Sequence, residues 1–241
     1  MNKHISPSMN QLKIIAMIFM FIDHFAYIMI ERGLGLGGNL YAIDRVLRGM
    51  GRIAFPIFCF TIVEGFQKSH DVRAYLRRLF LFALISEIPF DLAFRGSVIN
   101  MSYQNVFWTL GFGLAALILI EDPWMANWKK MIGLLMCFWL PNYFHTDYSA
   151  YGVLTIFAMY YFRKEPVKAC MAGYIVLLLL STTEVWAIFG FLLILLYNGK
   201  KGNGSKMFCY IFYPAHLIVL VAAKPTIVGI LSNFVIRTVR I

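Results

Sequence analysis

Residues 17–30 read MIFMFIDHFAYIMI, in which an acid and an imidazole, Asp23 and His24, stand side by side in an apolar run of membrane character. A charged side chain at bilayer depth costs several kcal/mol, so such residues usually face a protein interior or a water-filled cavity. Asp23 and His24 therefore have two interpretations. They are functional, which is the default for ionisable residues within a membrane, or they form a polar contact that fixes helix packing. We expect function.

The composition is that of an integral membrane protein. Of the 241 residues, 60% are hydrophobic and 14% are charged, whereas soluble domains are about a quarter charged. Apolar runs recur from about residue 11 to about residue 236, which leaves no room for a sizeable soluble domain. The net charge of +10 is carried in short clusters between these runs. Such clusters set membrane topology, so we do not expect a nucleic-acid partner.

Residues 1–241 are therefore expected to form a single all-α domain, a polytopic membrane protein with about ten transmembrane helices around a polar intramembrane cavity. Several predicted spans are shorter than the roughly 20 residues that cross a bilayer comfortably, so half-crossing helices remain an alternative for spans six to eight and the last. The predicted spans are 11–30, 50–66, 75–94, 105–121, 128–143, 150–162, 167–181, 184–198, 207–223 and 225–237.

The positions of lysine and arginine test this arrangement, because cytoplasmic connections carry an excess of basic residues. Basic residues cluster in alternate connections, while the intervening segments 141–149 and 181–185 hold none. We therefore predict a multi-pass protein with both termini in the cytoplasm and an even number of crossings. The clusters are Lys68, Arg73, Arg77 and Arg78; Lys129 and Lys130; Arg163, Lys164 and Lys168; and Lys200, Lys201 and Lys206.

The connection 31–50 departs from this pattern. It lies on the predicted outer side, yet it carries Arg32, Arg45 and Arg48. Its glycine-rich opening, GLGLGGNLYA, indicates a loop that leads into a short helix. That helix is either a solvated interfacial helix or one whose charges have a task other than setting topology.

Ionisable residues in several apolar runs indicate one shared cavity, because opposite charges offset the desolvation of each other. Asp23 is a poor partner for His24, since neighbours on a helix point about 100° apart. A carboxylate from another helix, Glu64 or Glu87, is expected to orient His24 better. The candidates in or beside the runs are Asp23, His24, Arg52, Glu64, Glu87, Asp91, Asn105, His145, Asp147, Tyr151 and His216.

Six ordered blocks resemble the TraX family, which is named for an F-pilin acetylation protein and is similar to multi-spanning acyltransferases that use acyl-CoA. The resemblance covers most of the chain, except spans seven and eight. The blocks are LKIIAMIFMFIDHFAYIM, GRIAFPIFCFTIVEGF, RRLFLFALISEIPFDLAF, QNVFWTLGFGL, DYSAYGVLTIFAMYYF and FYPAHLIVL. The residues on motif positions are Asp23, His24, Arg52, Pro56, Glu64, Glu87, Pro89, Asn105, Asp147, Tyr151, Gly152, Pro214 and His216.

The resemblance implies a membrane-embedded acetyltransferase of the bacterial inner membrane, with acetyl-CoA as donor. It leaves the acceptor open, as a hydroxyl or amine of a glycan, a lipid or a protein N-terminus at the outer face. Acyl transfer from a thioester needs a base for the acceptor's proton, and neutral imidazole suits that task near neutral pH. His24 is the expected base and His216 its rival. Arg52 is expected to bind a substrate anion or the developing oxyanion, or else to pair with Glu64 or Glu87.

Substrate binding is expected at a second set of residues. Arg77 and Arg78 would hold the phosphates of the donor at the basic inner face, or else act only as ordinary cytoplasmic charges. The other expected substrate-binding residues are Asn105, Asp147, Tyr151 and His216. The four cysteines, Cys59, Cys137, Cys170 and Cys209, lie in apolar runs and are expected to be buried hydrophobes, not thiol nucleophiles. A zinc site of His24, His145 and Asp147 would match no known spacing, so we expect no metal.

Two other classes of function compete with the acyltransferase. A secondary transporter or proton-coupled carrier also places Asp, Glu, His and Arg at the membrane midplane and uses short, interrupted helices, although no internal repeat is visible here. A scaffold for an envelope apparatus would explain the helices but not the clustered ionisable residues.

Overall fold

The computed structural model describes residues 6–37 and 39–239, and within them it confirms the all-α class. Here η1 is a π-helix and η2 a 3-10 helix. In chain order the elements are α1 (Met9–Phe25), η1 (Ala26–Leu34), α2 (Asn39–Gly51), α3 (Ala54–Lys68), α4 (Val72–Arg95), α5 (Val106–Glu121), α6 (Asn127–Tyr143), α7 (Ser149–Tyr161), α8 (Pro166–Leu180), η2 (Thr182–Trp186), α9 (Ala187–Leu195) and α10 (Lys206–Val239).

Side-chain caps fix where several helices begin and end. The Ser8 hydroxyl accepts from the backbone of Gln11, and the Gln11 side chain accepts from the Ser8 backbone at 2.8 Å, which is a capping box. Asp71 caps α4 and Asn105 caps α5 in the same manner. Helix α4 ends at Gly96, whose φ of 70° a residue with a side chain rarely adopts. The predicted spans in this part of the chain therefore lie within a few residues of the observed helices.

Helix α1 continues without a break into the π-helix η1, which begins two residues after His24. Together they form a segment, Met9–Leu34, of 26 residues that is long and apolar enough to cross a membrane. This segment contains the predicted span 11–30. A π-helical stretch is rare and is often found at functional sites.

Helix α2 returns alongside α1 and η1 and leads into α3. The segment Leu40–Lys68, of 29 residues, is thus a second one with the length and composition to cross a membrane. The sequence predicted a span at 50–66, preceded in residues 31–50 by a loop that leads into a short helix, and that short helix is confirmed as α2. Arg45 and Arg48 lower the apolar character of α2, so the sequence pattern did not show that this helix packs along the first one.

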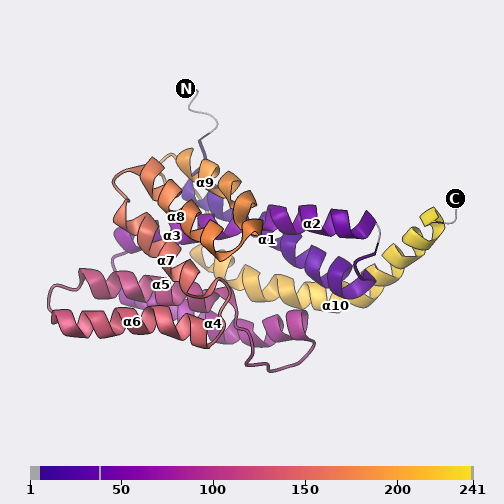
Figure 1. Ribbon diagram of the computed structural model, residues 1–241, viewed down its shortest axis with the longest axis horizontal. Helices are drawn as coiled ribbons and strands as arrows, with labels where there is room; N and C mark the ends of the chain where they lie inside the picture. Colours follow the sequence, from indigo (N-terminus) through magenta and orange to yellow (C-terminus); the bar gives the residue numbers. More distant parts are fainter. Residues whose placement is uncertain (1–5, 38, 240–241) are drawn as a thin grey trace.

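The helices α1, α3, α5, α4 and α10 form a ring, in which each packs on the next and α10 packs on α1. Helix α2 lies outside α1, while α6 and α7 cover α5, and α8 and α9 lie beyond α7 and α3 (Figure 1). Leu12, Ile57, Ala83, Leu114 and Leu217, one from each helix of the ring, have no exposed surface. The ring therefore encloses the main core.

Helix α10 is a single helix where the sequence predicted separate spans at 207–223 and 225–237. Pro225 does not end it, because a membrane helix tolerates a lost hydrogen bond where a neighbour packs against it, and η1 packs along α10. His216 lies opposite His24 and Val228 opposite Gly33, so α10 runs parallel to α1 and η1. The described end of α10 consequently lies far from the start of α1 (Figure 1). The expected even number of crossings does not follow from this course.

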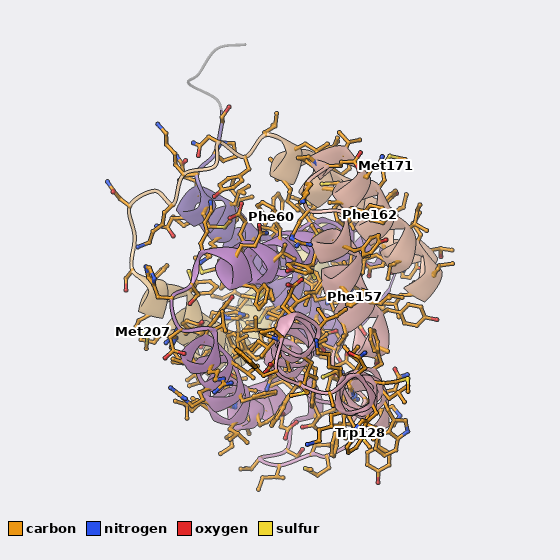
Figure 2. All side chains as sticks on the ribbon, turned by 90° about the vertical axis from the view of Figure 1, so that its left-hand side faces the viewer. Phe60, Trp128, Phe157, Phe162, Met171 and Met207 are labelled. Carbon is orange, nitrogen blue, oxygen red and sulfur yellow. The ribbon has the colours of Figure 1, made fainter. Side chains whose placement is uncertain are left out.

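The helix ends gather at two opposite ends of the molecule. We call one the basic end, since Lys13, Lys68, Arg78 and Lys201 lie there around one opening. Figure 2 looks onto this end, with Trp128 of α6 at its lower edge and Met207 of α10 at its left edge. The far end carries loop 144–148 and η2, which are linked through Arg52.

Large apolar side chains are exposed along the outer helices. On α6 the exposed fractions are 59% for Trp128, 61% for Met131 and 63% for Leu135. Soluble monomers rarely expose contiguous apolar patches above a few hundred Å². A third segment, Met207–Ser232, is also long and apolar enough to cross a membrane. These features support a membrane protein whose outer helices face lipid.

The course of α10 predicts the result of cysteine labelling. In a background with Cys209 replaced by serine, cysteines at Thr182 and Thr226 are expected to react with an impermeant maleimide on one side of the membrane. A cysteine at Asn203 is expected to react only from the other side, because the first part of α10, about 20 residues and long enough to cross a bilayer, lies between residues 203 and 226. Equal accessibility of residues 203 and 226 from one side would show that α10 does not cross.

Candidate functional site

Two cavities lie end to end between the helices of the ring. The larger, of about 350 Å³, opens at the basic end. The smaller, of about 50 Å³, is lined by Asp23 and His24. The larger cavity therefore leads from the basic end towards the residues that the sequence singled out first. The residues common to both linings are Met20, Phe58, Val106 and Tyr213.

His24 and His216 contact each other between α1 and α10. Nδ1 of His24 lies 2.7 Å from Nε2 of His216, and the two rings are inclined by only 9°. Nδ1 of His216 lies 2.8 Å from the carbonyl oxygen of Phe212, one turn earlier in α10. The edges of Phe94 and Tyr213 cover His24. The two histidines that were rival candidates for one role thus form a buried pair.

Asp23 is paired with Arg48 of α2. Nη1 of Arg48 donates to Oδ2 of Asp23 at 2.6 Å, and the guanidinium lies 5.1 Å from the centre of the Tyr27 ring. The other carboxylate oxygen, Oδ1, has no hydrogen-bond partner among the described residues. Helix α2 comes this close because position 51 is glycine, where a Cβ would collide with Asp23. Arg48 therefore pairs with a carboxylate inside the protein, which is a role other than setting topology.

Arg52, in the turn between α2 and α3, contacts two segments of the far end. Its Nη1 donates to the Tyr148 hydroxyl at 3.3 Å and lies 3.5 Å from Oε1 of Glu184. Glu184 is 2% exposed and belongs to η2. The Tyr148 ring stacks on Phe55 with 3.5 Å between ring centres. Arg52 thus has an internal carboxylate partner, but this partner is Glu184 and not the expected Glu64 or Glu87. Arg52 also lines the smaller cavity.

Loop 144–148 brings Asp147 and Tyr148 to the smaller cavity. The Tyr103 hydroxyl donates to Oδ1 of Asp147 at 2.7 Å, and the Thr109 hydroxyl donates to the carbonyl oxygen of Asp147. Burial raises the pKa of Asp147, while the hydrogen bond from Tyr103 opposes that shift. Tyr148 has a φ of 64°, a conformation that costs about 1–3 kcal/mol and persists only where the surroundings impose it. The loop is therefore held firmly at the site.

Glu64 lines the larger cavity and does not contact His24. Its carboxylate lies 2.9 Å from Nζ of Lys68, near the opening at the basic end. The expectation that Glu64 or Glu87 orients His24 is wrong, because Nδ1 of His24 already faces His216.

Glu87, Asn105 and Tyr151 line neither cavity. Oε1 of Glu87 accepts from the Asn105 side-chain amide at 2.6 Å and from Nε1 of Trp108 at 2.6 Å. Asn105 also caps α5, so these residues join α4 to α5. Tyr151 is 38% exposed on α7. Glu87 therefore has hydrogen-bond donors within the protein, from an indole and an amide, although it lies outside the cavity in which we expected it.

The two arginines expected to hold donor phosphates lie in different environments. Arg78 lines the larger cavity at its opening. Arg77, its neighbour in the sequence, is 73% exposed, lies 3.9 Å from Asp71 and lines neither cavity. Only Arg78 is in a position to contact a ligand in the cavity.

Sequence reasoning did not name Arg48, Tyr148, Glu184 or Tyr213 as site residues. Arg48 had a signal, because it stands four residues before Arg52 and therefore on the same helix face. Glu184 also had one, as the single charged residue between Lys168 and Lys200. Tyr148 and Tyr213 gave none, because the chain has 13 tyrosines and nothing in the pattern separates these two.

The cysteines and the possible metal ligands were also located in the structure. Cys59, Cys137 and Cys170 are buried and free, as expected, while Cys209 is half-buried and lines the larger cavity. Within residues 6–37 and 39–239, no group of three or more His, Cys, Asp or Glu side chains is arranged to hold a metal ion.

Comparison with known proteins agrees with the pattern of the six sequence blocks. Residues 8–224 match the family model described as TraX protein. The chain is 30% identical to the probable fimbrial assembly protein FimC, serogroup H1, of Dichelobacter nodosus, over 250 aligned positions that cover 93% of this chain and 98% of that protein. No solved structure matches the chain. The family match also includes spans seven and eight, which the blocks left uncovered.

Loss of Arg48 is expected to destabilise the fold. The Arg48→Gln substitution leaves the Asp23 carboxylate without its partner, at a cost of about 2 kcal/mol for a pair that is only partly buried. The unfolding midpoint in detergent should fall by about 4–8 °C. The control is Arg45→Gln on the exposed side of α2, where surface substitutions change stability by about 0.5 kcal/mol or less. Adding Asp23→Asn to Arg48→Gln should restore part of the loss, and equal midpoints for Arg45→Gln and Arg48→Gln would contradict the pairing.

Proposed function

The chain belongs to the TraX family, and we propose that it is a membrane-embedded acyltransferase that moves an acetyl group from acetyl-CoA to a hydroxyl or amine beyond the membrane. One observation carries this proposal. A cavity of about 350 Å³ opens among basic side chains and shares part of its wall with a smaller cavity, which is lined by His24 of the buried histidine pair. That arrangement suits a long anionic donor whose reactive end must reach a base away from water.

The donor is expected to enter from the basic end. Lys13, Arg78 and Lys201 come from α1, α4 and the loop before α10, and they line one opening. Three cations from separate elements suit a ligand that carries several phosphates. Lys68 is held differently, since Nζ lies 2.9 Å from Glu64 and donates to the Gly199 carbonyl at 3.1 Å.

The length of the cavity fits the thin arm of such a donor. His24 stands eleven residues after Lys13 on α1, which is about 16 Å at the helical rise of 1.5 Å per residue. The cavity volume of about 350 Å³ lies within the usual range for small-molecule sites. The walls offer the hydroxyl of Thr61 and the side chains of Tyr75 and Tyr210 among apolar residues, a suitable lining for an arm that alternates amide and methylene groups.

The transfer is direct, within a complex of both substrates. The acceptor oxygen or nitrogen attacks the thioester carbonyl carbon while His24 takes its proton. A bond from the acceptor to carbon forms, the carbon–sulfur bond breaks, and the thiolate leaves with the proton that His24 carried. Arg52 lines the same small cavity, where its guanidinium would stabilise the negative charge on the carbonyl oxygen.

The acceptor is expected to approach from the far end. Asp147 and Tyr148 belong to a loop of the far end and line the smaller cavity together with His24. Asp147 is the substrate-binding candidate that best fits an acceptor contact. The relative named as a fimbrial assembly protein favours a component of a surface fibre over a soluble metabolite. A glycan, a lipid and a protein N-terminus all remain within this acceptor class.

The same proposal sets the orientation in the membrane. Acetyl-CoA is cytoplasmic, so the basic end faces the cytoplasm, in agreement with the excess of lysine and arginine there. The start of α1 then lies on the cytoplasmic side of a bacterial inner membrane. The described end of α10 lies on the opposite side, which replaces the expectation that both termini are cytoplasmic.

The base is tested by substitution of His24. In purified protein supplied with labelled acetyl-CoA and a panel of acceptors, His24→Gln is expected to lower turnover by about 10²–10⁴-fold, the usual contribution of a positioned base. An amide forms hydrogen bonds but takes no proton at neutral pH. Affinity for acetyl-CoA should stay within about twofold. Near-normal turnover by a folded His24→Gln protein would remove His24 from this role, and proton-dependent uptake without acetyl transfer would favour a carrier.

The donor opening is tested by a matched pair of neighbouring arginines. Arg78→Gln is expected to weaken acetyl-CoA binding by about tenfold, the loss of roughly one charge-assisted hydrogen bond. Arg77→Gln removes the same charge from an exposed residue outside the cavity and should change the affinity less than about twofold. Calorimetry or a filter assay in detergent measures both. Equal effects of the two substitutions would mean that the phosphates do not dock in this opening.

A further inference from the structure

We propose that His216 is a positioning residue that fixes the tautomer of His24, so that Nε2 of His24 is the nitrogen that takes the acceptor's proton. The expected effect of His216 on turnover rests on the proposed function. Its structural content, the position of the proton on His24, stands on the hydrogen bonds alone and is tested separately.

The direction of the hydrogen bonds follows from the one partner that cannot donate. The carbonyl oxygen of Phe212 only accepts, so the proton in the 2.8 Å contact belongs to Nδ1 of His216. A neutral imidazole carries one proton, which leaves a lone pair on Nε2 of His216. The 2.7 Å contact between the two rings then requires a proton on Nδ1 of His24. Nε2 of His24 is thereby left with the lone pair that a general base needs.

The same logic excludes His216 as the base. One of its nitrogens faces the Phe212 carbonyl and the other faces His24, so neither is available to an acceptor. His216 is 5% exposed and lines neither cavity, whereas His24 lines the smaller one. The sequence left open which of the two histidines is the base. In this arrangement His24 is the base and His216 orients it.

The surroundings hold the pair in place without offering another proton acceptor to Nδ1 of His24. Phe94 and Tyr213 meet the His24 ring edge-on, with ring centres 5.1 and 6.0 Å away. Phe212 stacks on His216 with ring centres 4.9 Å apart. Asp23, the adjacent carboxylate, is bound to Arg48 on a different face of α1. The arrangement resembles the base and orienting group of a hydrolytic triad, with a neutral imidazole in the place of the carboxylate.

Turnover, compared with donor affinity, tests the positioning role. His216→Leu is expected to lower kcat by about 10- to 100-fold while the KM for acetyl-CoA stays within about twofold. His216→Gln should recover at least several-fold of that loss, because its amide oxygen can accept from Nδ1 of His24. The control Leu217→Val removes buried volume from the next position of α10 and should leave kcat within about twofold. A folded His216→Leu protein with wild-type kcat, or a His216→Gln protein no better than His216→Leu, would overturn the role.

A spectroscopic measurement tests the tautomer without any substrate. In protein labelled with ¹⁵N-histidine, the signals lost on His24→Gln identify His24 among the five histidines. The wild-type protein is expected to show His24 protonated at Nδ1, and His216→Leu should give a mixture of tautomers. Protonation at Nε2 in the wild type would overturn the inference. If this result holds but no acetyl transfer or acetyl-CoA binding is found, the proposed function fails and the histidine arrangement stands.

Discussion

The structure depends on one constraint, that an ionisable side chain within a bilayer needs a partner inside the protein. Asp23 is paired with Arg48, and Arg52 is paired with Glu184. Glu87 accepts hydrogen bonds from Trp108 and Asn105. Each of these contacts joins helices that are separate in the sequence. The polar residues therefore specify which helices meet and in what register, a task for which apolar packing alone gives little discrimination in a lipid environment.

The sequence was sufficient for what depends on composition and local pattern. It predicted the helical class, most helix limits between residues 72 and 180, the basic end, and the place of Asp23 and His24 beside a cavity within the protein. The reason is physical, since apolar length, capping residues and basic clusters act over a few residues. It also predicted that Arg52 would meet either a substrate or an internal carboxylate, and only the identity of that carboxylate was missed.

What the sequence could not supply were the partners. Nothing in the local pattern shows that Glu87 finds an indole and an amide, or that His24 finds a second histidine in place of a carboxylate. Position in three dimensions decides these pairings, and many arrangements of the same helices would satisfy the same composition. The division of α10 into two spans has a similar origin. The sequence pattern broke this helix at Lys224, whereas packing against η1 keeps it continuous.

The contact between His24 and His216 also has a consequence for the synthesis and membrane insertion of the protein. The two residues are separated by 192 positions, and ribosomes add about 5–20 residues per second. His24 therefore waits on the order of 10–40 s in the membrane before its partner has been synthesised. During that interval the first helix must hide its polar side chains against other chains or the insertion machinery. Helix α10 thus completes the histidine pair, and a nascent chain that stops short of residue 216 leaves His24 without this partner.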